Sequence, residues 1–80
     1  MRATVLVRPK QGILDPQGQA VGSSLRDLGF SVDEARVGRL IDLEFKVGTR
    51  DEARAAVERM CERLLANPLI ESYEIELAER

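Results

Sequence analysis

The chain has 80 residues with a formal net charge of −2, one cysteine and no histidine. This balance of charge argues against a general nucleic-acid binder, which normally carries a basic surface, and the lone Cys61 excludes an internal disulfide and a metal site of the usual kind. Because one core of this size rarely supplies more than about 3–5 kcal/mol of stability, we expect a single domain over residues 1–80 that gains support from self-association.

The first predicted element is a strand over residues 3–8. This segment is rich in β-branched side chains and alternates, which places Ala3, Val5 and Val7 on one face. Pro9 ends the strand, and residues 10–14 are expected to form a loop.

A helix is predicted over residues 16–28. Asp15 offers a side-chain oxygen to free backbone N–H groups, and Pro16 has no N–H to leave unpaired. Apolar side chains recur at helical spacing, namely Ala20, Val21, Leu25 and Leu28, and Gly29 suits the left-handed position after a helix. Gly18 costs the first turn about 1 kcal/mol relative to alanine, so it must leave room for a close neighbour. That neighbour is either another segment of this fold or the backbone of a partner protein.

Residues 33–47 alternate between polar and apolar side chains with a period of two. One face carries the apolar side chains Ala35, Val37, Ile41, Leu43, Phe45 and Val47. The segment is long for one strand, so Gly38 marks either a bend within one long strand or the turn between two strands.

A second helix is predicted from a capping box, formed by Thr49 and Glu52, to the helix-ending pair Asn67-Pro68. Its apolar stripe comprises Ala53, Ala56, Val57, Met60, Cys61, Leu64 and Leu65. A last strand is predicted over residues 72–78, with its odd-numbered side chains directed inward.

The order of these elements, strand, helix, one or two strands, helix, strand, predicts an α+β fold. We expect both helices to pack on one face of a small antiparallel sheet, because each strand offers one apolar face and each helix one apolar stripe. Apart from Leu6 and Leu40, the other sheet face carries polar and charged side chains of both signs. These are Arg2, Thr4, Arg8, Arg36, Glu44, Lys46, Glu74 and Glu76.

None of the reactive side chains is placed for catalysis. Cys61 has no histidine to act as a base, and it lies on the apolar stripe, where a free cysteine packs as a small apolar residue. Glu74 and Glu76 share a strand face but alternate as solvated side chains do. We therefore expect a chain without catalytic, cofactor-binding or metal-binding residues.

The start of the first helix carries a weak signal for an anion, because Arg8, Lys10 and Gly12 precede the capping Asp15. The glycine spacing, however, matches neither a P-loop nor a dinucleotide fingerprint. The signal therefore supports no nucleotide site.

Nothing in the sequence predicts export or membrane insertion. The apolar run after Arg2 is too short for a signal peptide, and no apolar run approaches the length of a membrane span. Together with the unpaired cysteine, these features lead us to expect a cytoplasmic chain.

Three segments of the chain carry a resemblance to a known family. They are residues 13–18 (ILDPQG), residues 35–39 (ARVGR), where arginine stands at a position that is usually lysine, and residues 60–73 (MCERLLANPLIESY). In this order they resemble PurS, the small subunit of phosphoribosylformylglycinamidine synthase. The third segment is the most specific, and the resemblance extends from Thr4 to Leu77.

The resemblance implies a role in purine biosynthesis. In the family, a glutaminase subunit, PurQ, releases ammonia, and a large synthetase subunit, PurL, binds ATP, magnesium and the ribonucleotide. PurS-like chains form a dimer or a dimer of dimers and bridge the two, so that glutamine-derived ammonia forms formylglycinamidine ribonucleotide. ATP, magnesium and glutamine would then be used by the partner subunits and not bound by this chain, and neither nucleic acid nor a membrane is an expected partner.

We predict that partner contacts are made by charged and capping residues around the first helix and the Gly38 region. The candidate interface residues are Arg8, Lys10, Asp15, Gln17, Gly18, Arg36, Arg39 and Asn67. For Arg36 and Arg39 the alternative is a set of cross-strand ion pairs with Glu34 or Glu44. Asn67 serves most simply as a helix stop.

Two other functions fit a small α+β domain. An RNA-recognition domain needs aromatic side chains on the open sheet face, and the polar and charged residues on that face set it aside. A small-molecule-sensing regulatory module needs a pocket of convergent polar groups at a dimer interface. The sensing module is the alternative to a bridging subunit.

Overall fold

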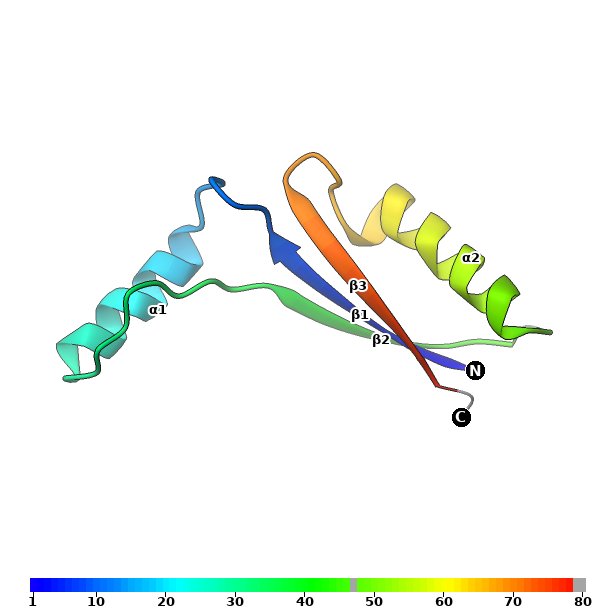
Figure 1. Ribbon diagram of the computed structural model, residues 1–80, viewed down its shortest axis with the longest axis horizontal. Helices are drawn as coiled ribbons and strands as arrows, with labels where there is room; N and C mark the ends of the chain where they lie inside the picture. Colours follow the sequence, from blue (N-terminus) through cyan, green and yellow to red (C-terminus); the bar gives the residue numbers. More distant parts are fainter. Residues whose placement is uncertain (47, 79–80) are drawn as a thin grey trace.

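The computed structural model describes residues 1–46 and 48–78. In chain order the elements are β1 (Arg2–Pro9), α1 (Pro16–Asp27), β2 (Arg39–Glu44), α2 (Arg50–Met60), a π-helical turn η1 (Cys61–Leu65) and β3 (Glu71–Ala78). The three strands form one antiparallel sheet in the order β2-β1-β3 (Figure 1). The predicted α+β class and the order of its elements are confirmed.

The core lies between the inner face of the sheet and α2. Ala3, Val5 and Val7 of the central strand β1 are fully buried, as their alternation predicts, and they pack with Val57 and Cys61. At the margin of this core lie half-buried side chains on the outer strands or directly after β2: Ile41, Leu43, Phe45, Tyr73, Ile75 and Leu77. The largest fully buried side chains are only valine and cysteine, so the core is small even for this chain length.

The second helix begins as predicted and ends differently. The Thr49 hydroxyl accepts from the Glu52 N–H at 3.1 Å, and the Glu52 carboxylate accepts from the Thr49 N–H at 3.0 Å, which is a complete capping box. At the other end the Ala66 N–H donates to the Cys61 carbonyl at 3.0 Å, which widens the last turn into η1. This extra residue rotates the end of the apolar stripe, so Leu64, predicted to be inside, is 83% exposed.

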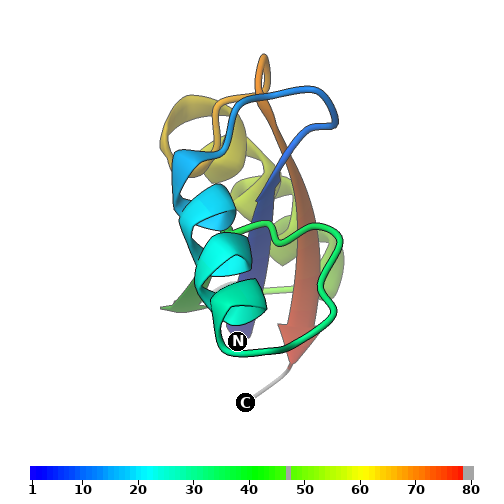
Figure 2. The same cartoon turned by 90° about the vertical axis from the view of Figure 1, so that its left-hand side faces the viewer.

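The first helix does not lie over the sheet within one chain, where the simplest packing would place it. α2 covers the inner face on the β3 side, whereas α1 stands beyond the end of the sheet (Figures 1 and 2). Gly18 and Gly22 are its buried residues, and they face Ala35 in the segment that leads into β2. The expectation that both helices share a sheet face therefore needs a refinement, because within one chain only α2 lies over the sheet.

The middle segment forms one strand and no hairpin. Pairing with β1 begins at Arg39, and residues 31–38, which we call the arm, lie outside the sheet and run beside α1 (Figure 2). Gly38 sits where a Cβ atom would run into the Val7 carbonyl oxygen of β1. Gly38 thus permits a close approach to β1 and forms no turn. Val47, which we predicted on the apolar face of this segment, lies outside the described residues.

Candidate partner-binding surfaces

The chemically reactive side chains Cys61 and Tyr73 make contacts within the chain. Cys61 is fully buried, and its burial, followed by the nearby charges of Glu62 and Glu58, raises the pKa of its thiol. The Tyr73 hydroxyl donates to the Glu62 carboxylate at 2.8 Å, which raises the pKa of Tyr73 to about 12. Among residues 1–46 and 48–78, no group of three or more carboxylate, thiol or imidazole side chains is arranged to hold a metal ion. Cys61 therefore contributes to packing, and the candidate binding residues lie on the surface of the chain.

The first surface is a depression of about 270 Å³ between the start of α1 and the sheet. It brings together three of the predicted interface residues, Asp15, Gln17 and Arg39, beside the apolar side chains of Leu14 and Ile70. Leu14 is 82% exposed. The Lys10 N–H donates to the Ile70 carbonyl at 2.9 Å, which ties the loop before α1 to the loop before β3.

Asp15 and Gly18 contact this chain's own backbone. The Asp15 carboxylate accepts from the Val37 N–H at 2.9 Å and from the Gly18 N–H at 3.0 Å, and these two bonds, in that order, lower its pKa. A Cβ atom on Gly18 would lie 2.5 Å from the Ala35 carbonyl oxygen. Of the two interpretations of Gly18, the geometry therefore favours a close neighbour within the fold.

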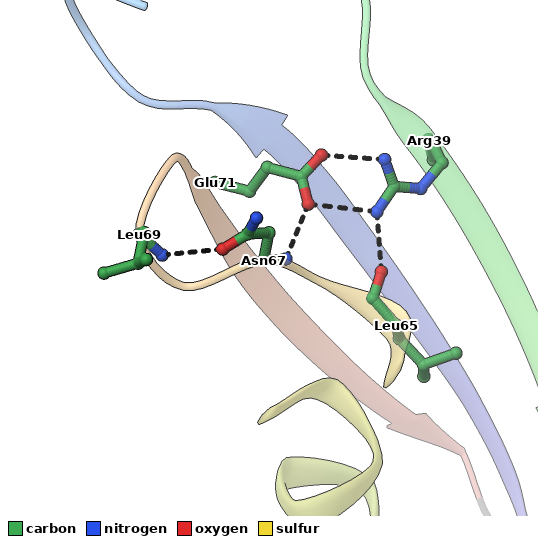
Figure 3. Close-up of polar contacts among 5 residues, drawn as sticks. All are labelled: Arg39, Leu65, Asn67, Leu69 and Glu71. Carbon is green, nitrogen blue, oxygen red and sulfur yellow. Dashed lines mark hydrogen bonds and ion pairs between the residues drawn. The ribbon is translucent and has the colours of Figure 1, made fainter. Parts of the chain in front are cut away.

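Arg39 holds three segments together (Figure 3). Its guanidinium forms a bidentate ion pair with the Glu71 carboxylate at 2.7 and 3.1 Å and donates to the Leu65 carbonyl at 2.6 Å. The ion pair lowers the pKa of Glu71 and raises that of Arg39. The alternative that paired Arg39 with Glu34 or Glu44 is wrong, because Arg39 reaches across β1 to β3 instead.

Asn67 shapes the loop between η1 and β3. Its N–H donates to the Glu71 carboxylate at 2.7 Å, and its side-chain oxygen accepts from the Leu69 N–H at 3.1 Å (Figure 3). The helix stop that the sequence predicts is confirmed, since Ala66 is already extended. The same bonds present Leu69, 84% exposed, at the tip of the loop.

The second surface is the open face of the sheet. A hollow of about 460 Å³ there brings Arg8, Arg36 and Arg39 around the apolar Leu6 and Leu40. Arg8 pairs with Glu74 at 3.3 Å, and Arg2 pairs with Glu44 at 3.0 Å. In the part of the chain that the structure describes, the side chains of Arg36, Lys10 and Gln17 make no hydrogen bond or ion pair, which leaves them open to a partner.

The sheet edges differ in a way that sequence reasoning missed. Arg50 and Arg54 of α2 donate to the carbonyls of Leu77 and Ile75 at 3.2 and 3.4 Å, so outward carbonyls of edge strand β3 are covered. No such bond covers the outer edge of β2 among the described residues. The signal was the spacing of Arg50 and Arg54 by one helical turn, but it has meaning only once β3 is known to lie beside α2.

The sequence comparisons point to one family. The family model described as "PurS: Phosphoribosylformylglycinamidine (FGAM) synthase" matches residues 2–79. The PurS subunit of Methanocaldococcus jannaschii phosphoribosylformylglycinamidine synthase is 38% identical over 77 residues, which cover 95% of this chain and 93% of that protein. The corresponding subunit of Bacillus subtilis is 38% identical over 79 residues, which cover 98% and 93%.

Solved structures show the same fold. The crystal structure of PurS from Methanocaldococcus jannaschii, described as one of the subunits of formylglycinamide ribonucleotide amidotransferase, superposes with a TM-score of 0.87 at 36% identity and covers 99% of this chain and 96% of that one. A chain from the structure of PurLQS from Thermotoga maritima superposes with a TM-score of 0.86 at 32% identity and covers 94% and 93%. The likeness therefore includes α1 and the arm as well as the sheet.

Proposed function

The chain belongs to the PurS family of phosphoribosylformylglycinamidine synthase subunits, and from this premise we propose that it joins a PurQ-type glutaminase to a PurL-type synthetase. As a PurS subunit of that enzyme it acts in purine biosynthesis. The observation that carries the bridging role is the match over nearly the whole chain to a subunit solved within PurLQS. The buried thiol of Cys61 also supports a role in assembly over one in catalysis.

The depression beside α1 and the open face of the sheet are the surfaces through which we expect this chain to contact its partners. The depression beside α1 offers exposed apolar side chains, Leu14 and Ile70, near the charged Arg39 and Asp15, and the open sheet face offers Arg8 and Arg36. An apolar patch rimmed by polar groups is typical of a protein interface. We assign the contacts with the glutaminase and the synthetase to these surfaces, and we expect self-association to a dimer or a dimer of dimers.

In this proposal ATP, magnesium and glutamine bind to the partner subunits. The isolated chain should bind none of them, which isothermal titration calorimetry measures directly. No helix in the described residues has both the length and the apolar character that a membrane span requires. We place the assembly in the cytoplasm, where the unpaired Cys61 is kept reduced.

Reconstitution tests the bridge. The glutaminase and the synthetase are mixed with and without this chain, and formation of the amidine is measured with glutamine and, separately, with ammonium chloride as the nitrogen source. A bridge that delivers glutamine-derived ammonia should be required for the glutamine-driven rate and should change the ammonia-driven rate by less than about twofold. Equal loss of both rates, or tight binding of a nucleotide by the isolated chain, would contradict the proposal and favour a regulatory module.

A further inference from the structure

Two loops at one end of the sheet present apolar side chains to solvent. The loop before α1 carries Ile13 and Leu14, the loop before β3 carries Leu69 and Ile70, and all four side chains are exposed. We propose that these four residues, the loop patch, dock onto an enzyme subunit of different sequence whose contact surface is apolar and bordered by carboxylates. This inference rests on the bridging function proposed above and names the residues and the chemistry of one of its contacts.

The two loops form one continuous surface. The Lys10 N–H donates to the Ile70 carbonyl at 2.9 Å, and Ile70 lines the depression of about 270 Å³ together with Ile13 and Leu14. Both ribbon views place the loops side by side at the end of the sheet opposite Met1 (Figures 1 and 2). Contiguous exposed apolar side chains bordered by polar groups are typical of a protein interface.

Hydrogen bonds hold the tip of the loop before β3 in place. The N–H groups of Ile70 and Glu71 donate to the Asn67 carbonyl at 3.0 and 2.7 Å, and the Asn67 side-chain oxygen accepts from the Leu69 N–H at 3.1 Å. The Glu71 carboxylate, which pairs with Arg39, accepts from the Asn67 N–H at 2.7 Å. Leu69 points away from the sheet (Figure 3). A loop fixed in this way loses little conformational freedom on binding, so Leu69 can anchor an interface.

The free charges beside the loop patch are positive. Both oxygens of Asp15 accept from backbone N–H groups of this chain, and both oxygens of Glu71 accept from Arg39. Within residues 1–46 and 48–78, the side chains of Lys10 and Arg36 make no hydrogen bond or ion pair. A surface that complements this border carries carboxylates, because opposite charges at the rim of an interface steer association.

The same charges argue against a second copy of this chain as the occupant. A two-fold contact of the loop patch with itself would bring Lys10 of both copies into one small interface, where like charges repel. A subunit of different sequence avoids this repulsion. The proposed assembly contains two such subunits, the glutaminase and the synthetase, and we expect the loop patch to serve one of them.

Leu64 provides a matched control for Leu69. The two leucines are equally open to solvent, at 83% and 84% exposed. Leu64 belongs to η1 and follows the charged Glu62 and Arg63, whereas Leu69 stands next to Ile70 in the loop patch. Truncating either leucine removes the same apolar group from the surface, so a difference between the two variants reports the position of the side chain.

Binding of the full chain to the glutaminase and to the synthetase, each measured alone by calorimetric titration, tests the docking. Leu69→Ala should raise Kd for one of the two subunits at least about thirtyfold, and Leu64→Ala should raise it by less than about threefold. The other subunit should bind both variants and the unsubstituted chain equally well. Equal binding of the two variants to both subunits, or loss of both contacts in Leu69→Ala, would overturn the inference and leave the bridge standing. An unsubstituted chain that binds neither subunit would overturn both proposals.

A charge reversal tests the chemistry of the partner. Lys10→Glu should weaken binding to the same subunit about tenfold at low ionic strength, and added salt should reduce this effect. Lys46, the other lysine of the chain, lies beside Met1 at the opposite end of the sheet, so Lys46→Glu is the control and should change Kd by less than about twofold. Unchanged or tighter binding by Lys10→Glu would contradict a carboxylate border. If sedimentation showed that Leu69→Ala weakens self-association and not subunit binding, the loop patch would belong to a second copy and the inference would fail.

Discussion

At the scale of single residues, the contact between α1 and the arm depends on two glycines and one carboxylate. Gly18 and Gly22 are the buried residues of α1, and their missing side chains let Ala35 approach the helix. Asp15 then binds the first turn of α1 and the Val37 N–H with its two oxygens. Gly18 lowers the intrinsic stability of the helix. The close contact that it allows with Ala35, 17 residues further along the chain, offsets this cost.

Gly18→Ala and Gly22→Ala should differ in sign. A Cβ on Gly18 would lie 2.5 Å from the Ala35 carbonyl oxygen, whereas a Cβ on Gly22 would meet only the flexible Arg26 side chain at 3.4 Å and the Ala35 Cβ at 3.6 Å. We expect Gly18→Ala to lower the free energy of unfolding by about 1–3 kcal/mol, and Gly22→Ala to leave it unchanged or raise it by up to about 1 kcal/mol through helix propensity. Urea denaturation measures both.

The Gly18→Ala variant also decides between the two interpretations of Gly18. If Gly18 serves only this fold, Gly18→Ala should lose stability but still assemble with the glutaminase and synthetase at a temperature where it is folded. Loss of assembly without loss of stability would assign Gly18 to a partner interface instead.

At the scale of elements, Arg39 and Glu71 join β2 to β3 and to the end of η1. The ion pair crosses β1, and Glu71 also accepts from the Asn67 N–H at 2.7 Å (Figure 3). The Glu71 side chain is only 17% exposed, against 74% for Glu44 in the pair with Arg2. The first pair should therefore stabilise the sheet, and the second should contribute little.

The stability of the chain should fall in acid through Glu71. The pKa of Glu71 is lowered from 4.5 by Arg39 and the Asn67 N–H, so its contribution is present above that value and is lost as the pH falls through the folded-state pKa. Glu71→Gln should lower the free energy of unfolding at pH 7 by about 1–2 kcal/mol and weaken its dependence on pH below 5. Glu44→Gln is the control. It should change the free energy of unfolding by less than about 0.5 kcal/mol and should leave its dependence on pH below 5 as it is in the unsubstituted chain. Equal effects of the two variants would show that the Arg39 contact is solvated and unimportant.

Sequence patterns within a few residues predicted where the helices begin and end. The tertiary contacts between these elements depend on residues far apart in the chain. The capping box at Thr49 and Glu52, the cap at Asp15 and the left-handed Gly29, with φ of 98°, each involve neighbours within a few residues, so the sequence specifies them. The partner of Arg39 lies 32 residues away and depends on β1 standing between β2 and β3, which no local pattern reveals. For the same reason the sequence did not predict the internal contacts of the candidate residues Asp15 and Arg39, whose partners Val37 and Glu71 lie 22 and 32 residues away.

At the scale of the whole molecule, the chain is too extended to cover its own apolar surface. Its principal extents are 50 × 27 × 14 Å, and α1 contributes only glycines to the set of buried residues (Figure 1). Among residues 1–46 and 48–78, no fully buried side chain is larger than valine. α1 leaves apolar side chains such as Val21 exposed in the single chain, so we expect the self-association proposed above to be coupled to folding.

Thermal unfolding should therefore depend on protein concentration. When the folded state is a dimer and the unfolded state a monomer, a hundredfold dilution weakens the folded dimer by about 2.7 kcal/mol, which corresponds to a fall of about 5–10 °C in Tm for two chains of this length. Scanning calorimetry or circular dichroism between micromolar and hundred-micromolar protein measures the shift. A Tm that stays constant over this range for the unsubstituted chain would mean that the single copy, despite its exposed α1, supplies all of its own stability.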